Sequence, residues 1–202
     1  MRWPINPYRL LDIPAVYRLT QKALAPGGRA HIDALLARLN DPADPRPWLD
    51  VGCGPNPLVP TPAGGLFVLD RTPSYVVGLD PSRFRPCVGD ATRLPFPPGH
   101  FGAVWSIGLL HHLSDTMTQS ALGEMVRVTA PGGHIHILDA VLPEPAWRRP
   151  LALGVRRLDR GRFMRRQRPW EALLPTSARW HTERQTYTAT GLELLVATGV
   201  PQ

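Results

Sequence analysis

The sequence predicts an α/β fold in which an open, doubly wound and mostly parallel sheet of seven strands carries helices on both faces. Five short apolar runs between residues 48 and 141 are separated by helices or turns, which is typical of parallel strands joined by crossovers. Two further β-rich runs flank Gly191 near the end of the chain and indicate an antiparallel hairpin at the sheet edge. Hydrophobic residues make up 43% of the 202 residues, which is enough for one folded domain.

Helices are expected before the first strand and after the fourth. Apolar residues recur at helical spacing in residues 14–25 and again in residues 29–39. The clearest helix covers Asp115–Val128, where Ser114 can cap the first turn and residues 131–133, Pro-Gly-Gly, supply a stop.

The strands are predicted from short apolar or β-branched runs bounded by glycine, proline or aspartate. They cover residues 48–52, 66–70, 86–89, 103–108 and 134–141, followed by the hairpin strands 184–190 and 192–198.

The formal net charge of +7 belongs to one segment. Residues 143–184 hold eleven arginines and four acidic residues, whereas the rest of the chain is neutral. Leu151, Val155 and Leu158 recur there at helical spacing and predict an amphipathic helix with its arginines off the apolar stripe. The arginines are either a solvated helix face or a contact for an anionic acceptor, an acidic carrier protein, an anionic membrane surface or RNA.

Composition also limits the compartment and the metal content. Cys53 and Cys87 form neither a disulfide framework nor a metal-ligand spacing, so we expect a reducing compartment and no metal. The first residues lack the apolar region of a signal peptide, and no apolar run approaches the roughly 20 residues that span a bilayer. The expected location is the cytoplasm.

The first strand ends in a glycine turn, Asp50-Val51-Gly52-Cys53-Gly54. Glycines after a strand let the backbone approach a ligand closely, although the same residues also form purely structural turns. The turn is not the dinucleotide motif G-x-G-x-x-G, because Pro57 stands at the third glycine position.

Carboxylates at the ends of the next strands are candidates for ligand hydroxyls and amines. Asp70 lies eighteen residues after Gly52 and twenty before Asp90, whereas Asp80 gives spacings of twenty-eight and ten. A strand, a helix and its turns need about twenty residues, which favours Asp70 over the alternative Asp80 for binding vicinal hydroxyls.

Six segments resemble, in order, the motifs of the class I S-adenosylmethionine-dependent methyltransferases, and the small-molecule branch with the ubiquinone and menaquinone biosynthesis enzymes is the most similar group. They are WLDVGCG (48–54), DRTPSY (70–75), GDATRLPF (89–96), HFGAVWS (100–106), LLHHL (109–113) and EMVRVTAPGG (124–133). The resemblance implies a Rossmann-like fold, the cofactor S-adenosylmethionine and the product S-adenosylhomocysteine. Asn56 replaces a small residue of the family pattern, and Pro55, Pro57, Pro60 and Pro62 predict that the helix after the turn is short or irregular.

The same resemblance implies a set of cofactor contacts. Asp50, Gly52 and Gly54 would bind the methionine moiety, Asp70 the ribose, and Asp90 with Ala91 the adenine. The sulfonium would lie beside residues of the fourth strand end, Ser106, Ile107 and Gly108.

A general base is needed mainly when the methyl acceptor is a hydroxyl group. His111 and His112 follow the fourth strand as the one adjacent histidine pair of the sequence, and histidine has a suitable unperturbed pKa. The alternative is that the pair is a packing feature of the family.

The whole chain is interpreted as a single methyltransferase domain. Residues 1–46 form a helical cap, 47–142 the cofactor-binding core, 143–179 an arginine-rich substrate lid and 180–202 the closing hairpin. The expected reaction is direct displacement onto oxygen or carbon of a small acceptor that is hydrophobic or anionic, carrier-bound or membrane-derived. An RNA methyltransferase is disfavoured because only the basic charge indicates a nucleic-acid partner, and a catalytically silent cofactor-binding protein is the other alternative. The sequence does not indicate the oligomeric state.

Overall fold

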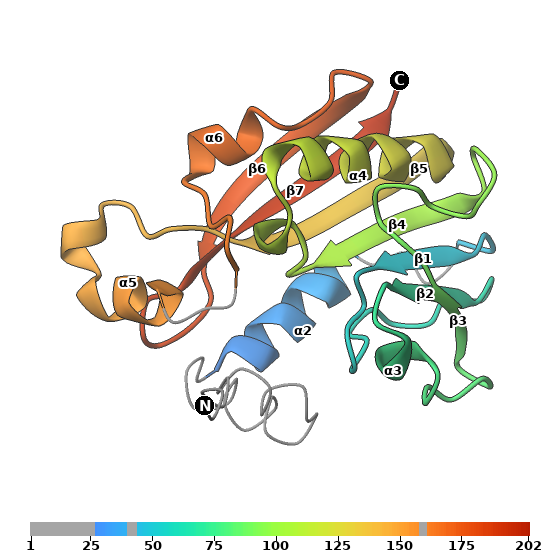
Figure 1. The fold of residues 1–202 in the computed structure, drawn as a ribbon, viewed down its shortest axis with the longest axis horizontal. Coiled ribbons are helices and arrows are strands. Elements are labelled where there is room, and N and C mark those ends of the chain that lie inside the picture. The colour runs from blue at the N-terminus through green and yellow to red at the C-terminus, as the bar shows by residue number, and fades with distance from the viewer. Residues whose placement is uncertain (1–26, 40–43, 158–160) are drawn as a thin grey trace, which may run out of the picture.

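The computed structural model describes residues 27–39, 44–157 and 161–202, which form a single seven-stranded sheet (Figure 1). The strand order is β3-β2-β1-β4-β5-β7-β6. Strands β1 to β5 run parallel, and β7 is antiparallel to both of its neighbours, which confirms the predicted topology. The strands are β1 (Trp48–Val51), β2 (Leu66–Asp70), β3 (Phe84–Val88), β4 (Phe101–Ile107), β5 (Thr129–Ala140), β6 (Ala178–Thr186) and β7 (Glu193–Pro201).

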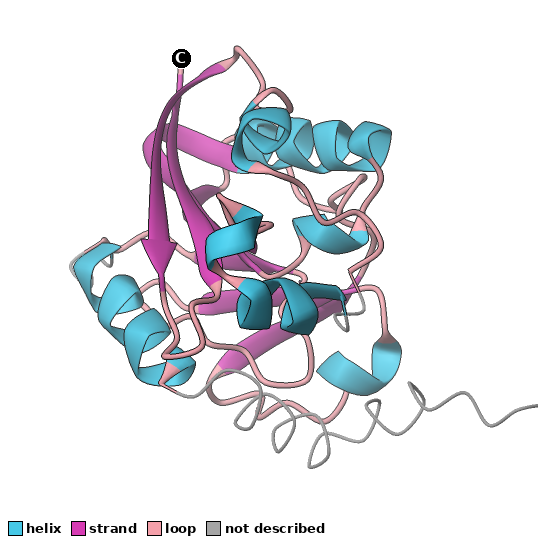
Figure 2. Cartoon of the chain, turned by 90° about the vertical axis from the view of Figure 1, so that its left-hand side faces the viewer, coloured by secondary structure: helices cyan, strands magenta, loops and turns pink. Residues whose placement is uncertain are grey.

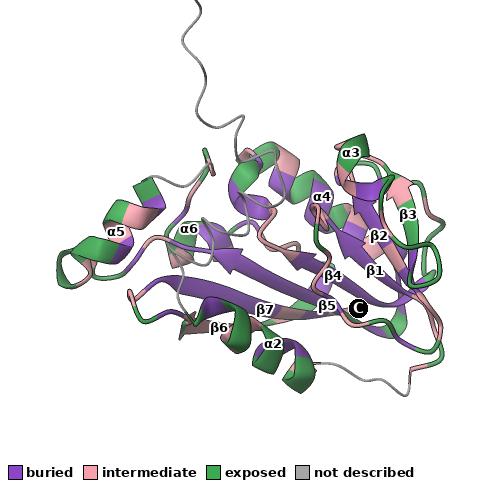
Figure 3. Ribbon diagram, turned by 90° about the horizontal axis from the view of Figure 1, so that it is seen from below, coloured by how far each residue is buried: buried purple, intermediate pink, exposed green. Residues whose placement is uncertain are grey.

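Helices lie on both faces of the sheet (Figure 3). The predicted helices 29–39 and 115–128 are confirmed, and the prediction for residues 14–25 lies outside the described residues. The helices are α2 (Gly28–Leu39), α3 (Pro73–Val76), α4 (Asp115–Val128), α5 (Pro150–Arg157) and α6 (Gln167–Glu171), with 3-10 turns η2 (Leu110–His112) and η3 (Ala146–Arg148).

Helix α4 begins with the predicted cap, but its last turn ends differently from the prediction. The Ser114 hydroxyl accepts the Met117 amide at 3.4 Å and caps the first turn. At the other end, the Thr129 hydroxyl donates to the Met125 carbonyl at 2.6 Å and the chain turns directly into β5. Residues 131–133 therefore do not stop the helix; they lie within β5, next to a register shift between Phe101 and Ala103 of β4.

The core has two layers because successive strand residues point to opposite faces. In β1, Leu49 and Val51 pack in the cluster that includes α4, whereas Trp48 packs with Leu35 and Leu36 of α2.

The connection between β1 and β2 contains no helix, in agreement with its four prolines. Residues 52–65 form turns and extended loop, and Leu58 and Val59 pack against the α2 face of the sheet. The loop thus covers part of the face that a crossover helix would otherwise bury.

The closing hairpin lies at the sheet edge, but its strands differ from the predicted ranges. They pair from Ala178 with Pro201 to Thr186 with Glu193, and residues 187–192 connect them. Thr188 closes this loop, since its hydroxyl accepts the Leu192 amide at 2.9 Å and its carbonyl accepts the Gly191 amide at 3.1 Å. β-Branched composition in residues 187–192 therefore reflects a hydrogen-bonded loop rather than strand.

Helix α5 turns a different side inward from the predicted one. Leu151 is 72% exposed, whereas Ala152 and Arg156 are buried. Arg156 Nη2 donates to the Glu193 carbonyl at 2.6 Å and to the Tyr187 hydroxyl at 3.3 Å. These acceptors on the hairpin hold a guanidinium inside, so Leu151 of the predicted apolar stripe is not on the buried side. Leu158 of that stripe lies outside the described residues.

Candidate functional site

A buried carboxylate lies at the end of β1. Asp50 is almost completely buried, and its Oδ1 has no hydrogen-bond partner. Burial, together with the nearby charge of Asp70, raises the pKa of Asp50 to about 7. A buried, incompletely paired carboxylate is suited to an ammonium group, because a charge-assisted hydrogen bond would offset its desolvation.

The raised pKa of Asp50 predicts a pH-dependent stability. Between the unperturbed value of 3.8 and about 7, the folded chain retains a proton that the unfolded chain has lost. The contribution of Asp50 to the free energy of unfolding is therefore greatest below pH 3.8 and falls as pH rises through 7. Urea unfolding of Asp50→Asn should show this slope removed, whereas a control at the exposed Asp80, Asp80→Asn, should retain it. An unchanged slope in Asp50→Asn would contradict the assignment.

The glycine turn brings the ends of β1 and β2 together. Gly52 has φ +75°, and a Cβ there would lie 2.8 Å from the Leu109 side chain. The Gly52 amide donates to the Leu69 carbonyl at 2.7 Å, while the Gly54 amide donates to the Asp70 carboxylate at 3.1 Å. The backbone at Gly52 thus serves the turn, and Asp70 is held at its rim.

Asp70 and Asp80 occupy different kinds of position. Asp70 is the last residue of β2, and its second oxygen accepts the Thr72 amide at 2.8 Å. Asp80 is exposed before β3 and accepts the amide and the hydroxyl of Ser82. Of the two, only Asp70 stands at the carboxyl end of a strand beside the glycine turn.

Asp90 and Ala91 follow β3 with opposite surroundings. Asp90 is exposed, and the Thr92 amide and hydroxyl lower its pKa by hydrogen bonding to its carboxylate. Ala91 is buried in the core cluster on the α4 face.

At the end of β4, a buried hydroxyl group joins two strands and a turn follows. Ser106 is fully buried and donates to the Val51 carbonyl at 3.1 Å, so its side chain joins β4 to β1. Ile107 packs in the α2-side core, and the Gly108 amide donates to the Leu138 carbonyl at 2.8 Å.

The histidine pair stands on η2, and one of its members has a buried hydrogen-bond partner, Asp139, that the sequence reasoning missed. His111 is buried, and its Nδ1 lies 2.6 Å from Oδ1 of the fully buried Asp139. The Trp170 indole donates to the other oxygen of Asp139 at 3.2 Å. His112 is exposed, with its ring centroid 4.1 Å from that of His111. Asp139 is a carboxylate near the end of a parallel strand, the signal already used for Asp50 and Asp70.

The segment after α5 lies against the same histidine. A Cβ on Gly161 would clash with the His111 ring, and the Phe163 amide donates to the His111 carbonyl at 3.0 Å. Arg165 is buried and donates to the carbonyls of Leu110 and Leu113 at 3.0 and 2.7 Å. Residues 161–165 therefore form a wall beside the histidine pair.

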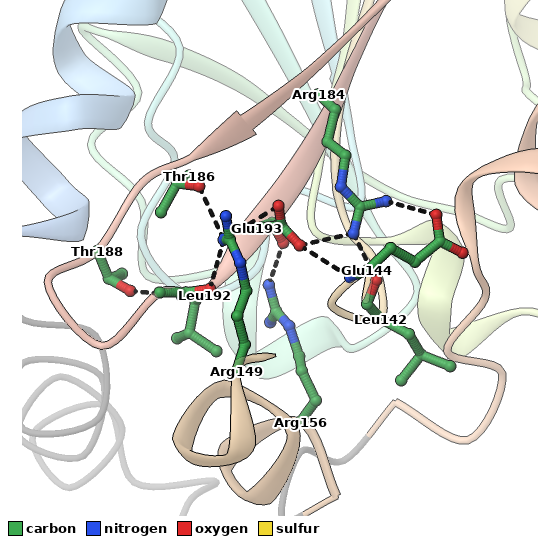
Figure 4. Close-up of polar contacts among 10 residues, drawn as sticks. Leu142, Glu144, Arg149, Arg156, Arg184, Thr186, Thr188, Leu192 and Glu193 are labelled. Atoms are coloured by element: carbon green, nitrogen blue, oxygen red, sulfur yellow. Dashed lines mark hydrogen bonds and ion pairs between the residues drawn. The ribbon is translucent and has the colours of Figure 1, made fainter. Parts of the chain in front are cut away.

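Other arginines of residues 143–184 form hydrogen bonds and ion pairs within the chain (Figure 4). Glu193 is buried, and its carboxylate lies 3.0 Å from Arg149 Nη1 and 2.6 Å from Arg184 Nη2. Arg184 also lies 3.4 Å from Glu144, and Arg156 binds the Glu193 carbonyl. Some arginines of residues 143–184 therefore bind α5 to the hairpin.

No helix within residues 27–39, 44–157 and 161–202 has the length and apolar content needed to cross a membrane. Within the same ranges, histidine, cysteine, aspartate and glutamate form no group of three or more that could hold a metal ion.

Comparisons with known proteins match the chain to methyltransferases. Residues 49–137 match the family described as "Methyltransferase domain". The chain is 36% identical over 110 residues to a demethylmenaquinone methyltransferase of Mycolicibacterium paratuberculosis, covering 48% of the chain and 47% of that protein. It is 34% identical over 146 residues to a demethylmenaquinone methyltransferase of Beutenbergia cavernae, covering 67% and 57%. These matched segments span about half the length of the two relatives.

A solved structure of a geranyl diphosphate methyltransferase in complex with SAM has the same fold. It superposes with a TM-score of 0.66 at 12% identity, covering 100% of this chain and 93% of the other. The match over residues 49–137 and the similarity to these relatives identify a class I S-adenosylmethionine-dependent methyltransferase, and the fold is the one expected of that class. The chain belongs to this family and is a distant homologue of the demethylmenaquinone methyltransferases.

Proposed function

We propose that the protein transfers a methyl group from S-adenosylmethionine to a hydroxyl oxygen of a small-molecule acceptor. The observation that carries the proposal is the placement of two sets of groups at one end of the sheet. Asp50 and Asp70 lie at the carboxyl ends of the neighbouring parallel strands β1 and β2, and the His111–Asp139 pair lies at the corresponding ends of β4 and β5. Figure 1 shows these four strands side by side. Ligands of doubly wound sheets bind at the carboxyl ends of the strands.

The residues at β1 and β2 fit the cofactor. The unpartnered Oδ1 of Asp50 would accept the ammonium group, and Asp70, already fixed by two amides, would accept the ribose hydroxyls. Asp90 and Ala91 would hold the adenine, with Gly52, Gly54 and the backbone of Ser106, Ile107 and Gly108 lining the rest. When bound, the cofactor supplies a methyl carbon that its sulfonium makes electrophilic.

His111 is the base that the geometry favours. The Asp139 carboxylate accepts the Nδ1 proton, so Nε2 is the basic nitrogen of the neutral ring. A protic acceptor would deliver its proton to Nε2 while its oxygen takes the methyl group, and Asp139 would stabilise the imidazolium that results. His112 is the second candidate, because its ring is exposed beside that of His111.

Calorimetric titration of the full chain tests the cofactor half of the proposal. We expect binding of S-adenosylmethionine and S-adenosylhomocysteine, and an affinity at least about tenfold lower in Asp70→Asn, since each good charge-assisted hydrogen bond contributes about 1.5 kcal/mol or more. Asp80→Asn is the matched control and should bind as the unmodified chain does. Absence of binding by the folded chain, or equal losses in both variants, would contradict the proposal.

A further inference from the structure

Two large apolar side chains are exposed on the α5 segment, defined here as residues 145–157. Trp147 is 75% and Leu151 72% exposed. Trp147 lies in η3, and Leu151 lies in the first turn of α5, four residues further along the chain. Arg156 occupies the inward side of α5, and Leu151 lies on its exposed side.

The part of the chain that carries this pair is rich in positive charge. Residues 145–170 contain nine arginines and a single acidic residue, Asp159. The Arg148 guanidinium lies 4.8 Å from the centroid of the Trp147 ring, an arrangement that keeps cation and aromatic side chain together at the surface. The exposed arginines are Arg148, Arg157, Arg162, Arg166 and Arg168.

We propose that Trp147, Leu151, Arg148 and Arg157 form a docking surface for a bilayer that contains anionic phospholipids. Basic segments with outward Trp and Leu side chains place the apolar groups at headgroup depth, while arginines pair with phosphate groups. Figure 1 shows α5 at one end of the long axis of the molecule, beyond the sheet.

The wall of the proposed acceptor site follows the docking surface in the sequence. Gly161 and Phe163 contact His111, and Phe163 is itself 40% exposed. Docking would hold this side of the site toward the bilayer. This step alone rests on the proposed function, and it would suit an acceptor dissolved in the membrane.

Co-sedimentation with vesicles tests the docking surface without cofactor or acceptor. The full chain should pellet with vesicles of phosphatidylcholine and phosphatidylglycerol, should pellet much less with phosphatidylcholine alone, and should dissociate as salt screens the arginines. Trp147→Ser with Leu151→Ser should weaken vesicle binding about tenfold or more, because the buried apolar area is lost. Val77→Ser is the control, since Val77 is 77% exposed far from α5 beside β3. Arg148→Gln with Arg157→Gln should reduce the preference for anionic lipid, unlike Arg83→Gln.

Several results would overturn the inference. One is equal sedimentation with both lipid compositions, and another is unchanged vesicle binding by the Trp147 and Leu151 variant. A lowered melting temperature in that variant would show that the pair is covered within the chain, because truly exposed side chains contribute little to stability. Binding to an acidic protein or to RNA without vesicle binding would assign the surface to another partner. Cofactor titration of the same samples keeps failure of docking distinct from failure of the proposed function.

Discussion

A His111→Asn variant is expected to transfer methyl groups about 10² to 10⁴ times more slowly than the unmodified chain, the usual contribution of general acid–base catalysis. The asparagine side chain cannot take a proton at the position of Nε2. Affinity for S-adenosylmethionine should stay the same, because His111 lies on η2 and its side chain is not among the proposed cofactor contacts. The measurement is kcat with a methyl acceptor, and His181→Asn, on the edge strand β6, is the matched control.

An Asp139→Asn variant tests whether the histidine pair acts in catalysis or only in packing. An amide offers one acceptor and one donor group, so it cannot accept from both His111 and Trp170 as the carboxylate does. We expect kcat to fall. We also expect activity to rise at a lower pH than in the unmodified chain, since the carboxylate no longer stabilises the imidazolium. A histidine pair that only packs would change neither the pH profile nor kcat in a variant that remains folded. A larger loss in His112→Asn than in His111→Asn would assign the proton transfer to His112.

The second large effect concerns stability. Glu193→Gln is expected to lower the free energy of unfolding by about 3 kcal/mol or more, because Arg149 and Arg184 lose the buried carboxylate between them. Urea unfolding measures the change. Glu183→Gln is the control: its ion pair with Arg38 is solvent-exposed, so the expected loss is below about 1 kcal/mol. Similar small losses in both variants would show that the Glu193 network does not stabilise the fold.

Local patterns in the sequence were sufficient for much of the fold. The strand Leu66–Asp70 and the helix Asp115–Val128 were predicted to the residue, because an apolar run before an aspartate and a serine cap are signals contained within a few positions. The glycine turn and the order of strand-end carboxylates were likewise visible.

The features that the sequence did not predict have a common physical cause. The buried side of α5 depends on Arg156 meeting acceptors of the hairpin, about thirty residues further along the chain. The role of Asp139 depends on His111 and Trp170, which come from η2 and α6. Periodicity assigns arginine to the surface and cannot register partners that tertiary structure supplies. The same limit hid the use of Arg165 and Arg184 inside the chain.

The helix-free connection after β1 affects ligand selectivity. A crossover helix at this position would direct the positive end of its dipole toward the strand ends, where it would attract phosphate groups. Here Asp50, Asp70 and Asp90 follow three neighbouring strands with no such helix after β1 to offset their charge. This local potential opposes phosphorylated nucleotides and favours a ligand that carries positive charge. A nucleoside bearing a sulfonium and an ammonium group meets that condition, whereas a dinucleotide does not.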